Sequence, residues 1–295
     1  MRHQPRPPEE LIRRIGWQIH SRDPTEVYEE RGSLQWDFTR SLLPSDWSFA
    51  GKRVLDFGCG IGRMIRNGPE LEPAGEYWGC DIDARSVAWL QENLAPPLHV
   101  FQSSEWPPCP LPDGHFDLIY SYSVFTHLTA SWSAWLLELH RLLKPEGYLI
   151  VTVGGPGLIE HIGIPLDPDR LGMNVFAPYT PWDGGGPLVF HSEWWLRAHW
   201  GRAFEILELR PGDPSAAPPL FGQGVVVMRK RPIAPTIEEL ERPEPGELRE
   251  LSALQANVAS LTTELGWHTV YLTSRSWRLT APLRAARRRL GRAGR

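Results

Sequence analysis

The sequence predicts an α/β fold with a doubly wound, mostly parallel, seven-stranded sheet and an added C-terminal helical segment. Three observations predict this fold. Short apolar segments alternate with amphipathic segments of helical period between residues 53 and 153. A glycine-rich turn follows the first apolar segment, as expected where a strand passes into a helix. Two further apolar segments, residues 204–209 and 224–229, complete the sheet.

Composition limits the class of protein. The chain has 295 residues and 41% hydrophobic content, which suits one medium domain with additions or two small domains. A net charge of -4 argues against a nucleic-acid coat, so we expect no nucleic-acid partner. There is no run of 18 apolar residues and no apolar leader, and Cys59, Cys80 and Cys109 show no C-x-x-C pairing. We therefore expect a cytoplasmic protein without a disulfide framework or a metal site.

The elements follow in chain order. A helix over residues 26–43 precedes the first strand, which begins at Val54. The later strands are expected at residues 78–80, 99–102, 116–121, 148–153, 204–209 and 224–229, and the helices at 85–94, 132–143 and 191–200. This order predicts an N-terminal extension and helical cover over residues 1–48 and a main domain over 49–231. A Pro-rich linker is expected over 232–246 and a helical segment with a basic tail over 247–295.

The turn after the first strand predicts a ligand site. Asp56 closes the strand, and Gly58, Gly60 and Gly62 follow at alternate positions. Glycines let the backbone turn sharply and approach a ligand, and a helix starting near Met64 would add unpaired N–H groups. The G-x-G-x-G spacing differs from the G-x-G-x-x-G of dinucleotide folds. The alternative is a tight strand-to-helix turn without a ligand.

A second acid lies at the end of the next strand. Asp81 follows Cys80 and stands 25 residues beyond Asp56. A carboxylate at that place can accept both hydroxyls of a ribose. The alternative is that Asp81 caps the following helix. Ligands of such sheets bind outside the carboxyl ends of the strands, where Gly58, Asp81, Glu105 and Ser121 all fall.

These motifs resemble those of the class I S-adenosylmethionine (SAM)-dependent methyltransferases. The resemblance covers roughly residues 25–230 and is most specific in Asp56–Gly62, in residues 111–128 and in residues 138–151. It implies SAM as the cofactor, with the acid and glycines at its amino-acid end and Asp81 at its ribose. An acid after the third strand often contacts the adenine; Glu105 replaces the commoner Asp there, and Ser104 is its rival. The resemblance thus implies that SAM is bound by Asp56, Gly58, Cys59, Gly60, Gly62, Asp81, Ile82, Ser104, Glu105 and Ser121.

Residues 154–190 are rich in Gly and Pro, and we expect them to form a lid over the substrate. Tyr179 and Trp182 offer aromatic surfaces that suit sugars and other flat or apolar acceptors. His161 and His191 lie in or beside this segment. Residues 190–229 resemble, more loosely, bacterial methyltransferases of surface-polysaccharide pathways. A small molecule or a glycan is therefore the expected substrate.

A hydroxyl acceptor needs a base that titrates near neutrality, which favours histidine. His127 lies just past the fourth strand, near the methyl group that the resemblance places there. An ordinary packing role is the alternative for this histidine. The N/D-P-P-Y motif of amino-directed DNA methyltransferases is absent. Two other classes of function stay open: a nicotinamide-dependent oxidoreductase, and a non-catalytic scaffold that acts through the C-terminal segment.

The C-terminal segment predicts an assembly or localisation function. Leu251, Leu254, Val258, Leu261 and Leu265 repeat at 3-4-3-4 spacing, which is typical of a coiled coil. We expect a homo-oligomer through residues 248–265, or a helix packed on its own domain. The tail that follows carries only basic charges, and part of it resembles the ends of bacterial glycosyltransferases and their partners. It predicts binding to an acidic partner, to a glycosyltransferase or to the inner face of the membrane; a disordered tail is the alternative.

Overall fold

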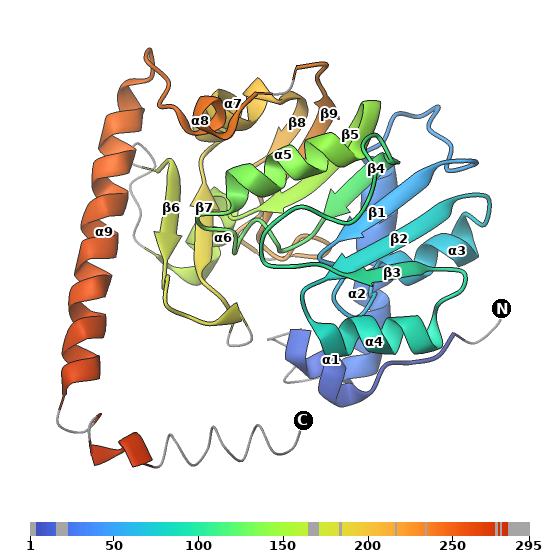
Figure 1. Cartoon of the computed structure of the whole chain (residues 1–295), viewed down its shortest axis with the longest axis horizontal. Helices are drawn as coiled ribbons and strands as arrows, with labels where there is room; N and C mark the ends of the chain where they lie inside the picture. Colours follow the sequence, from blue (N-terminus) through green and yellow to red (C-terminus); the bar gives the residue numbers. More distant parts are fainter. Residues whose placement is uncertain are drawn as a thin grey trace.

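A seven-stranded sheet forms the centre of the molecule (Figure 1). The computed structural model describes residues 4–15, 23–164, 171–182, 185–215, 217–233, 235–274, 277 and 279–282. The strand order is β3-β2-β1-β4-β5-β9-β8; the first five are parallel, whereas β9 runs antiparallel to β5 and to β8. The strands are β1 (Arg53–Phe57), β2 (Glu76–Asp81), β3 (His99–Gln102), β4 (Phe116–Ser121), β5 (Leu143–Val153), β8 (Phe204–Arg210) and β9 (Gly224–Lys230). The predicted fold class is confirmed.

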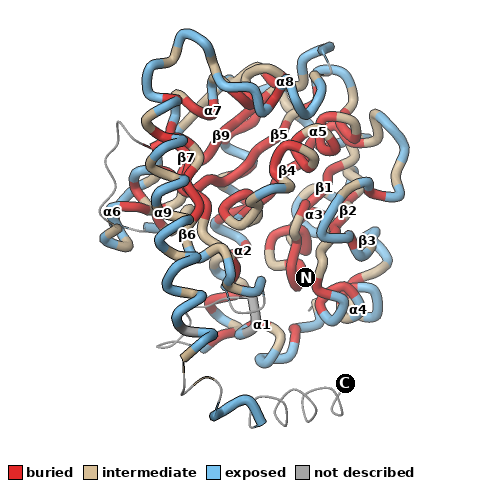
Figure 2. The backbone as a smooth tube through the Cα atoms, turned by 60° about the vertical axis from the view of Figure 1, so that its left-hand side comes forward, coloured by how far each residue is buried: buried red, intermediate tan, exposed pale blue. Residues whose placement is uncertain are grey.

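Helices cover both faces of the sheet because successive strand residues point to opposite sides. Val54 packs on the face that carries α2 (Pro24–Ser41), α3 (Gly68–Leu71) and α4 (Ala84–Asn93). Leu55 packs on the opposite face, which carries α5 (Trp132–Leu142), α7 (Glu193–His199) and α8 (Ile237–Glu241). Figure 2 shows β4, β5 and β9 as a continuous buried centre. The carboxyl ends of β1, β2 and β4 therefore open at one edge, between the two helical layers.

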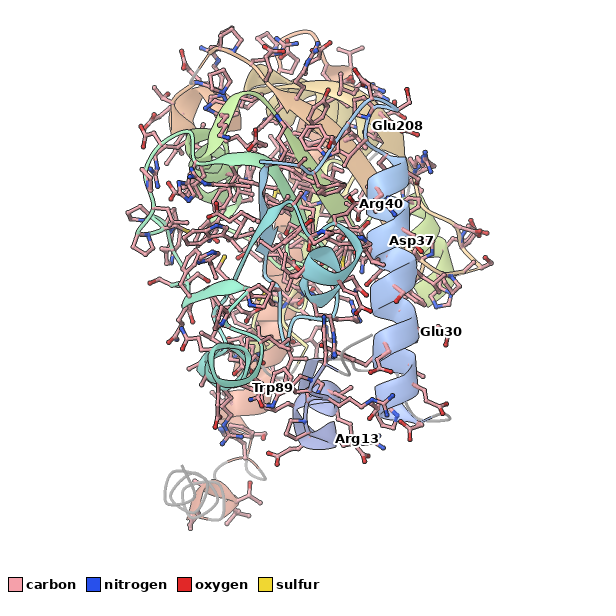
Figure 3. All side chains as sticks on the ribbon, turned by 90° about the vertical axis from the view of Figure 1, so that its right-hand side faces the viewer. Arg13, Glu30, Asp37, Arg40, Trp89 and Glu208 are labelled. Atoms are coloured by element: carbon pink, nitrogen blue, oxygen red, sulfur yellow. The ribbon has the colours of Figure 1, made fainter. Side chains whose placement is uncertain are left out.

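The first two helices lie against the glycine-rich turn. Helix α1 (Glu9–Ile15) packs on α2, which Asp23 caps by accepting hydrogen bonds from two backbone amides. Gly32 lets α2 approach closely, because a Cβ at that position would lie 2.2 Å from the carbonyl oxygen of Arg63. Arg40, at the other end of α2, forms a 2.6 Å ion pair with Glu72 after α3. Figure 3 shows α2 running along the outside of this face, with Arg40 among its labelled residues.

The segment expected to be a lid has secondary structure of its own. Helix α6 (Pro156–Ile162) ends at Gly163, and β6 (Met173–Phe176) pairs antiparallel with β7 (Leu188–His191). The helix predicted over 191–200 begins only at Glu193, because His191 still belongs to β7 and Ser192 caps the helix. The described part of the segment is thus a small helix and a two-stranded hairpin beside the main sheet.

Part of the segment expected to be a linker, residues 235–246, is attached to the domain although most of its side chains are exposed. It contains α8, whose Leu240 is fully buried in the core on the α5 side. The carbonyl oxygen of Leu240 accepts hydrogen bonds from His199 Nδ1 at 2.7 Å and from Arg202 at 3.1 Å. The proline content predicted a flexible linker. Instead, the buried side chain of Leu240 and its carbonyl, which bonds His199, attach the segment to α7.

Helix α9 (Leu248–Thr273) stands beside β6 at one edge of the molecule (Figure 1). Among the described residues, no helix has both the length and the apolar character needed to cross a membrane. The basic tail on which the membrane prediction rests, Arg275, Arg278 and residues 283–295, lies outside the described part of the chain.

Candidate active site

The glycine-rich turn is held against the end of β2. The amides of Gly58 and Cys59 both donate to the carbonyl of Cys80, each at 2.9 Å. Gly58, Gly60 and Gly62 have φ values of 78°, 54° and 76°, a region that favours glycine. A Cβ at Gly58 would also lie 2.2 Å from a Val124 methyl carbon. The turn therefore needs glycine for both its conformation and its packing.

The regular helix expected to start near Met64 does not form. A 3-10 helix (Ile65–Asn67) and the four-residue α3 follow the turn instead. A dipole of this length contributes little to anion binding. The polar character of the turn instead comes from backbone amides and from neighbouring side chains.

The carboxylate of Asp81 lies over the turn. Its Oδ2 accepts the amide of Gly60 at 2.7 Å, and its Oδ1 accepts the amide of Asp83 at 2.8 Å. Each oxygen keeps a second lone pair for a further donor. The cap of α4 is Asp83, which accepts the Ser86 amide, so the alternative role considered for Asp81 belongs to its neighbour. Burial raises the pKa of Asp81.

Asp56 is buried beneath the turn, in register with Tyr120 of β4. Burial raises its pKa to about 7, although the Tyr120 hydroxyl and Arg63 oppose the shift. Cys59 is also buried beside it, and burial raises the pKa of its thiol well above the ordinary value. Asp56 thus lies between its two charge states at neutral pH, while the Cys59 thiol is uncharged and its contact with the cofactor stays a prediction.

Two residues near the turn complete the cofactor side. Arg63, which the sequence analysis missed, lies near Asp56 and Tyr28, and burial together with Arg31 lowers its pKa. Within the described residues its guanidinium forms no ion pair. Tyr28 of α2 donates a 2.7 Å hydrogen bond to the carbonyl of Ile61 and so fixes the turn from the outside. The sequence feature that could have identified Arg63 is a cationic residue directly after Gly62.

The loop after β3 carries the two candidates for adenine contact. The side chains of Ser104 and Glu105 are both exposed, and the Glu105 carbonyl accepts Trp135 Nε1 at 3.0 Å. Glu138 of α5 holds the same loop by accepting the Cys109 amide at 2.7 Å. Ile82 contributes its carbonyl, which accepts the Gln102 side chain at 3.3 Å. The structure brings these residues to the same edge as Asp81 without choosing between Ser104 and Glu105.

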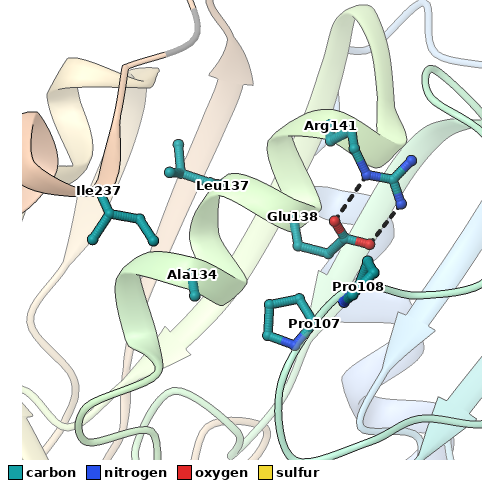
Figure 4. Close-up of a pocket in the computed structure, with 7 residues that line it drawn as sticks. All are labelled: Pro107, Pro108, Ala134, Leu137, Glu138, Arg141 and Ile237. Atoms are coloured by element: carbon teal, nitrogen blue, oxygen red, sulfur yellow. Dashed lines mark hydrogen bonds and ion pairs between the residues drawn. The ribbon is translucent and has the colours of Figure 1, made fainter.

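Glu138 is itself fixed by Arg141, with contacts of 2.8 and 2.7 Å (Figure 4). This pair lines a shallow groove whose other walls are Pro107, Pro108, Ala134, Leu137 and Ile237. Both charged groups are satisfied inside the fold, since Arg141 also donates to the Leu111 carbonyl at 2.9 Å. The groove therefore contributes support for the loop and no reactive group.

His127, the residue predicted to act as a base, lies after β4. Its Nδ1 is 2.7 Å from the carbonyl oxygen of Pro187, just before β7. A carbonyl only accepts, so Nδ1 carries the proton and Nε2 keeps its lone pair. Burial lowers the pKa of His127, which favours the neutral ring. Ser121, at the end of β4, is fully buried, and its hydroxyl has no partner among the described residues.

The remaining residues predicted to contact substrate are dispersed. Tyr179 is 47% exposed and stacks on His268 of α9 at 4.3 Å, and Trp182 is 44% exposed. His161 lies on α6, where its Nδ1 is 3.1 Å from the Pro214 carbonyl. These three stay predictions for substrate contact.

His191 has a different position from the one expected. It is buried between Trp195 and Trp200, at ring distances of 5.5 and 5.6 Å, and neither ring nitrogen has a partner among the described residues. Burial lowers its pKa to about 3, so the ring is neutral. Its expected contact with substrate needs correction, because the side chain packs against the rings of Trp195 and Trp200 in the core.

Comparison with known proteins agrees with this geometry. Residues 55–151 match the family described as a methyltransferase domain. An uncharacterized methyltransferase of Schizosaccharomyces pombe is 31% identical over 106 residues, covering 33% of this chain and 38% of the relative. A fatty-acid O-methyltransferase of Mycolicibacterium smegmatis is 27% identical over 106 residues, covering 36% and 38%. The chain thus spans well under half the length of these curated relatives.

Solved structures show the same fold. A SAM-dependent methyltransferase from Mesorhizobium loti aligns with a TM-score of 0.50 and 19% identity, over 67% of this chain and 98% of its own. A protein from Pyrococcus horikoshii aligns with a TM-score of 0.51 and 13% identity, over 74% and 98%. At these identities the likeness concerns the fold, which is the Rossmann-like fold of a methyltransferase.

Proposed function

We propose that this protein is a SAM-dependent methyltransferase that transfers a methyl group to a hydroxyl of a small molecule or glycan. The observation that carries the proposal is the Asp81 carboxylate held over a glycine-rich turn. This turn lies within the residues that match a methyltransferase domain. A dinucleotide-binding oxidoreductase would instead need the longer G-x-G-x-x-G turn.

The residues present fit SAM. Asp81 has accepting capacity left on both carboxylate oxygens for the ribose hydroxyls. Arg63 offers a partly buried cation for the carboxylate of the cofactor, and Asp56 an acid for its amino group. Gly58 and Gly60 expose backbone where a side chain would block approach. Bound SAM would supply a methyl group on a sulfonium, which is already a good leaving group.

On the acceptor side the protein itself must supply orientation and a base. His127 Nε2 can take the proton of an acceptor hydroxyl, because Pro187 holds Nδ1–H and fixes that tautomer. Two relatives support an oxygen acceptor by name, the fatty-acid O-methyltransferase and a malonyl-[acyl-carrier protein] O-methyltransferase of Legionella pneumophila. The loose resemblance of residues 190–229 leads us to propose a surface-polysaccharide pathway as the setting.

Calorimetry with SAM tests the cofactor assignment. Asp81→Ala should weaken binding by roughly 1.5–3 kcal/mol, the range for hydrogen bonds to a charged group. Asp83→Ala is the matched control: it removes a carboxylate two residues away that caps α4, so it should lower stability by about 1 kcal/mol and spare SAM affinity. Unchanged affinity in Asp81→Ala would contradict the assignment.

Thermal shifts separate the other classes of function. We expect SAM, and not NADH, to raise the melting temperature of the full chain, since only a bound ligand stabilises the folded state. Stabilisation by NADH alone would favour the oxidoreductase. Stabilisation by neither ligand would favour the scaffold.

A further inference from the structure

Helix α9 uses a polar face to contact its own domain. Asn257 Oδ1 accepts the amide of Val175 at 3.0 Å, and Glu264 Oε1 accepts the amide of Ala177 at 3.2 Å. Nearer the start of α9, the buried Glu250 lies 3.3 Å from His199 Nε2. These contacts, together with the stacking of His268 on Tyr179, attach α9 to β6 and to the residues that follow it. The domain therefore takes up the hydrogen-bonding side of the helix and leaves its apolar side uncovered.

The apolar side is the seam formed by Leu251, Leu254, Val258, Leu261 and Leu265. Leu251, Val258 and Leu265 each follow a contact residue directly, so this part of the seam lies roughly a quarter turn around the helix from the domain. Leu261 is half-buried and borders the domain. Leu251 is 64% exposed, Leu254 44%, Val258 62% and Leu265 50%. Figure 2 shows most of α9 as exposed, in contrast to the buried strands behind it. Exposed apolar rows of this length mark an interaction surface.

We propose that the seam of α9 binds the same seam of a second copy of this chain, forming a symmetric dimer. In a coiled coil, apolar side chains spaced 3-4 on one helix insert between the side chains of a second helix with the same spacing. A second copy of α9 has this spacing. In a two-fold pair each residue meets the same surface on its partner, so like charges would repel. Residues 251–263 contain no charged residue, and the pairing meets no such repulsion.

The charges of α9 disfavour a membrane surface as the occupant. Helices that lie in the membrane interface carry Lys or Arg on the polar face beside an apolar one. Within α9 the only such residue is Arg249, which pairs with Glu247 and lies over the Trp194 ring at 5.2 Å. The polar faces of α9 carry Ser, Thr, Gln and Asn, with Glu250 and Glu264 turned to its own domain. This composition suits a protein partner with the same pattern.

Light scattering coupled to size exclusion tests the dimer with the full chain. The wild type should have twice the chain mass of 33.5 kDa, with the dimer fraction falling on dilution. Leu254→Asp/Val258→Asp places charges in the seam and should give a monomer. Ala259→Asp/Thr263→Asp adds the same charges at the same spacing on exposed positions off the seam, and should stay dimeric. Equal SAM-induced thermal shifts in all three proteins would show that each is folded.

Two outcomes would overturn the proposal. One is a seam variant that remains a dimer. The other is a monomeric wild type that binds vesicles of phosphatidylglycerol and phosphatidylcholine and loses this binding in the seam variant, which would assign the seam to the membrane. A dimer that only the seam variant abolishes supports it. If the seam variant fails to show a SAM-induced shift, Leu254→Ser/Val258→Ser replaces it, with the same expected monomer.

Discussion

The cofactor side of this site and the side where we propose that the acceptor binds, called the acceptor side below, are built in different ways. On the cofactor side, Asp56, the three glycines and Asp81 belong to two consecutive strand–turn units, and Asp81 bonds Gly60 only 21 residues away. On the acceptor side, His127 is held by Pro187 across 60 residues, and Val175 by Asn257 across 82. A local motif thus forms the first half, whereas tertiary contacts with a hairpin and a C-terminal helix form the second.

This difference predicts which measured property a substitution in each half should change. A change on the cofactor side should act on SAM affinity or on the titration of groups beneath the turn, with the acceptor unaffected. A change on the acceptor side should leave SAM affinity unchanged and alter turnover or acceptor affinity. The predictions below test whether the two halves are separable in this way.

The largest expected effect concerns Asp56. Its folded-state pKa of about 7 lies above the ordinary 3.8, so between these pH values the folded chain keeps a proton that the unfolded chain has lost. Stability of the ligand-free protein should therefore fall as pH rises from 4 to 7, by about 4 kcal/mol in total. Asp56→Asn removes this titration, so urea unfolding of the variant should depend much less on pH over that window.

Parallel pH dependence in the two proteins would refute a raised pKa for Asp56, because all other titrating groups are common to both. The pH dependence of SAM affinity is a second test of the same group. If Asp56 contacts its cationic amino group, SAM affinity of the wild type should increase as pH rises through 7. The acceptor side contains none of these groups, so acceptor affinity should lack this particular dependence.

The same contrast explains how far the sequence could be interpreted. Strand positions and the glycine–Asp81 spacing are local patterns, so the fold class and the core of the cofactor side were predictable. Leu240 and α8 were not, because a five-residue helix in a Pro-rich segment has no periodic pattern and its burial depends on α5 and α7. His191 was misplaced because its burial depends on the rings of Trp195 and Trp200, which follow β7 in the fold and which no local pattern at His191 indicates.

His127 should give the next largest effect, on turnover. His127→Ala should reduce kcat about 10²-fold, the contribution of a positioned base, while calorimetry shows unchanged SAM affinity. His99→Ala is the control, since that exposed ring lies at the start of β3, away from the carboxyl ends of the strands, and should keep turnover within about twofold. Because burial lowers the pKa of His127, wild-type kcat should persist below pH 6.5 and fall only as the ring becomes protonated. Near-normal turnover in His127→Ala would assign this ring to packing.

The smallest expected effect tests whether α9 belongs to the acceptor side. Asn257→Ala removes the acceptor of the Val175 amide at the edge of β6, at a cost of about 0.5–1.5 kcal/mol if water replaces it poorly. The hairpin that holds His127 through Pro187 should then open more often, so hydrogen exchange at Val175 and Ala177 should accelerate. The KM for the acceptor should rise severalfold with SAM affinity unchanged. Gln255→Ala, an exposed change on the same helix, should do neither. If Asn257→Ala weakened SAM binding as much as acceptor binding, the two halves would be coupled through the sheet, and their separation would fail.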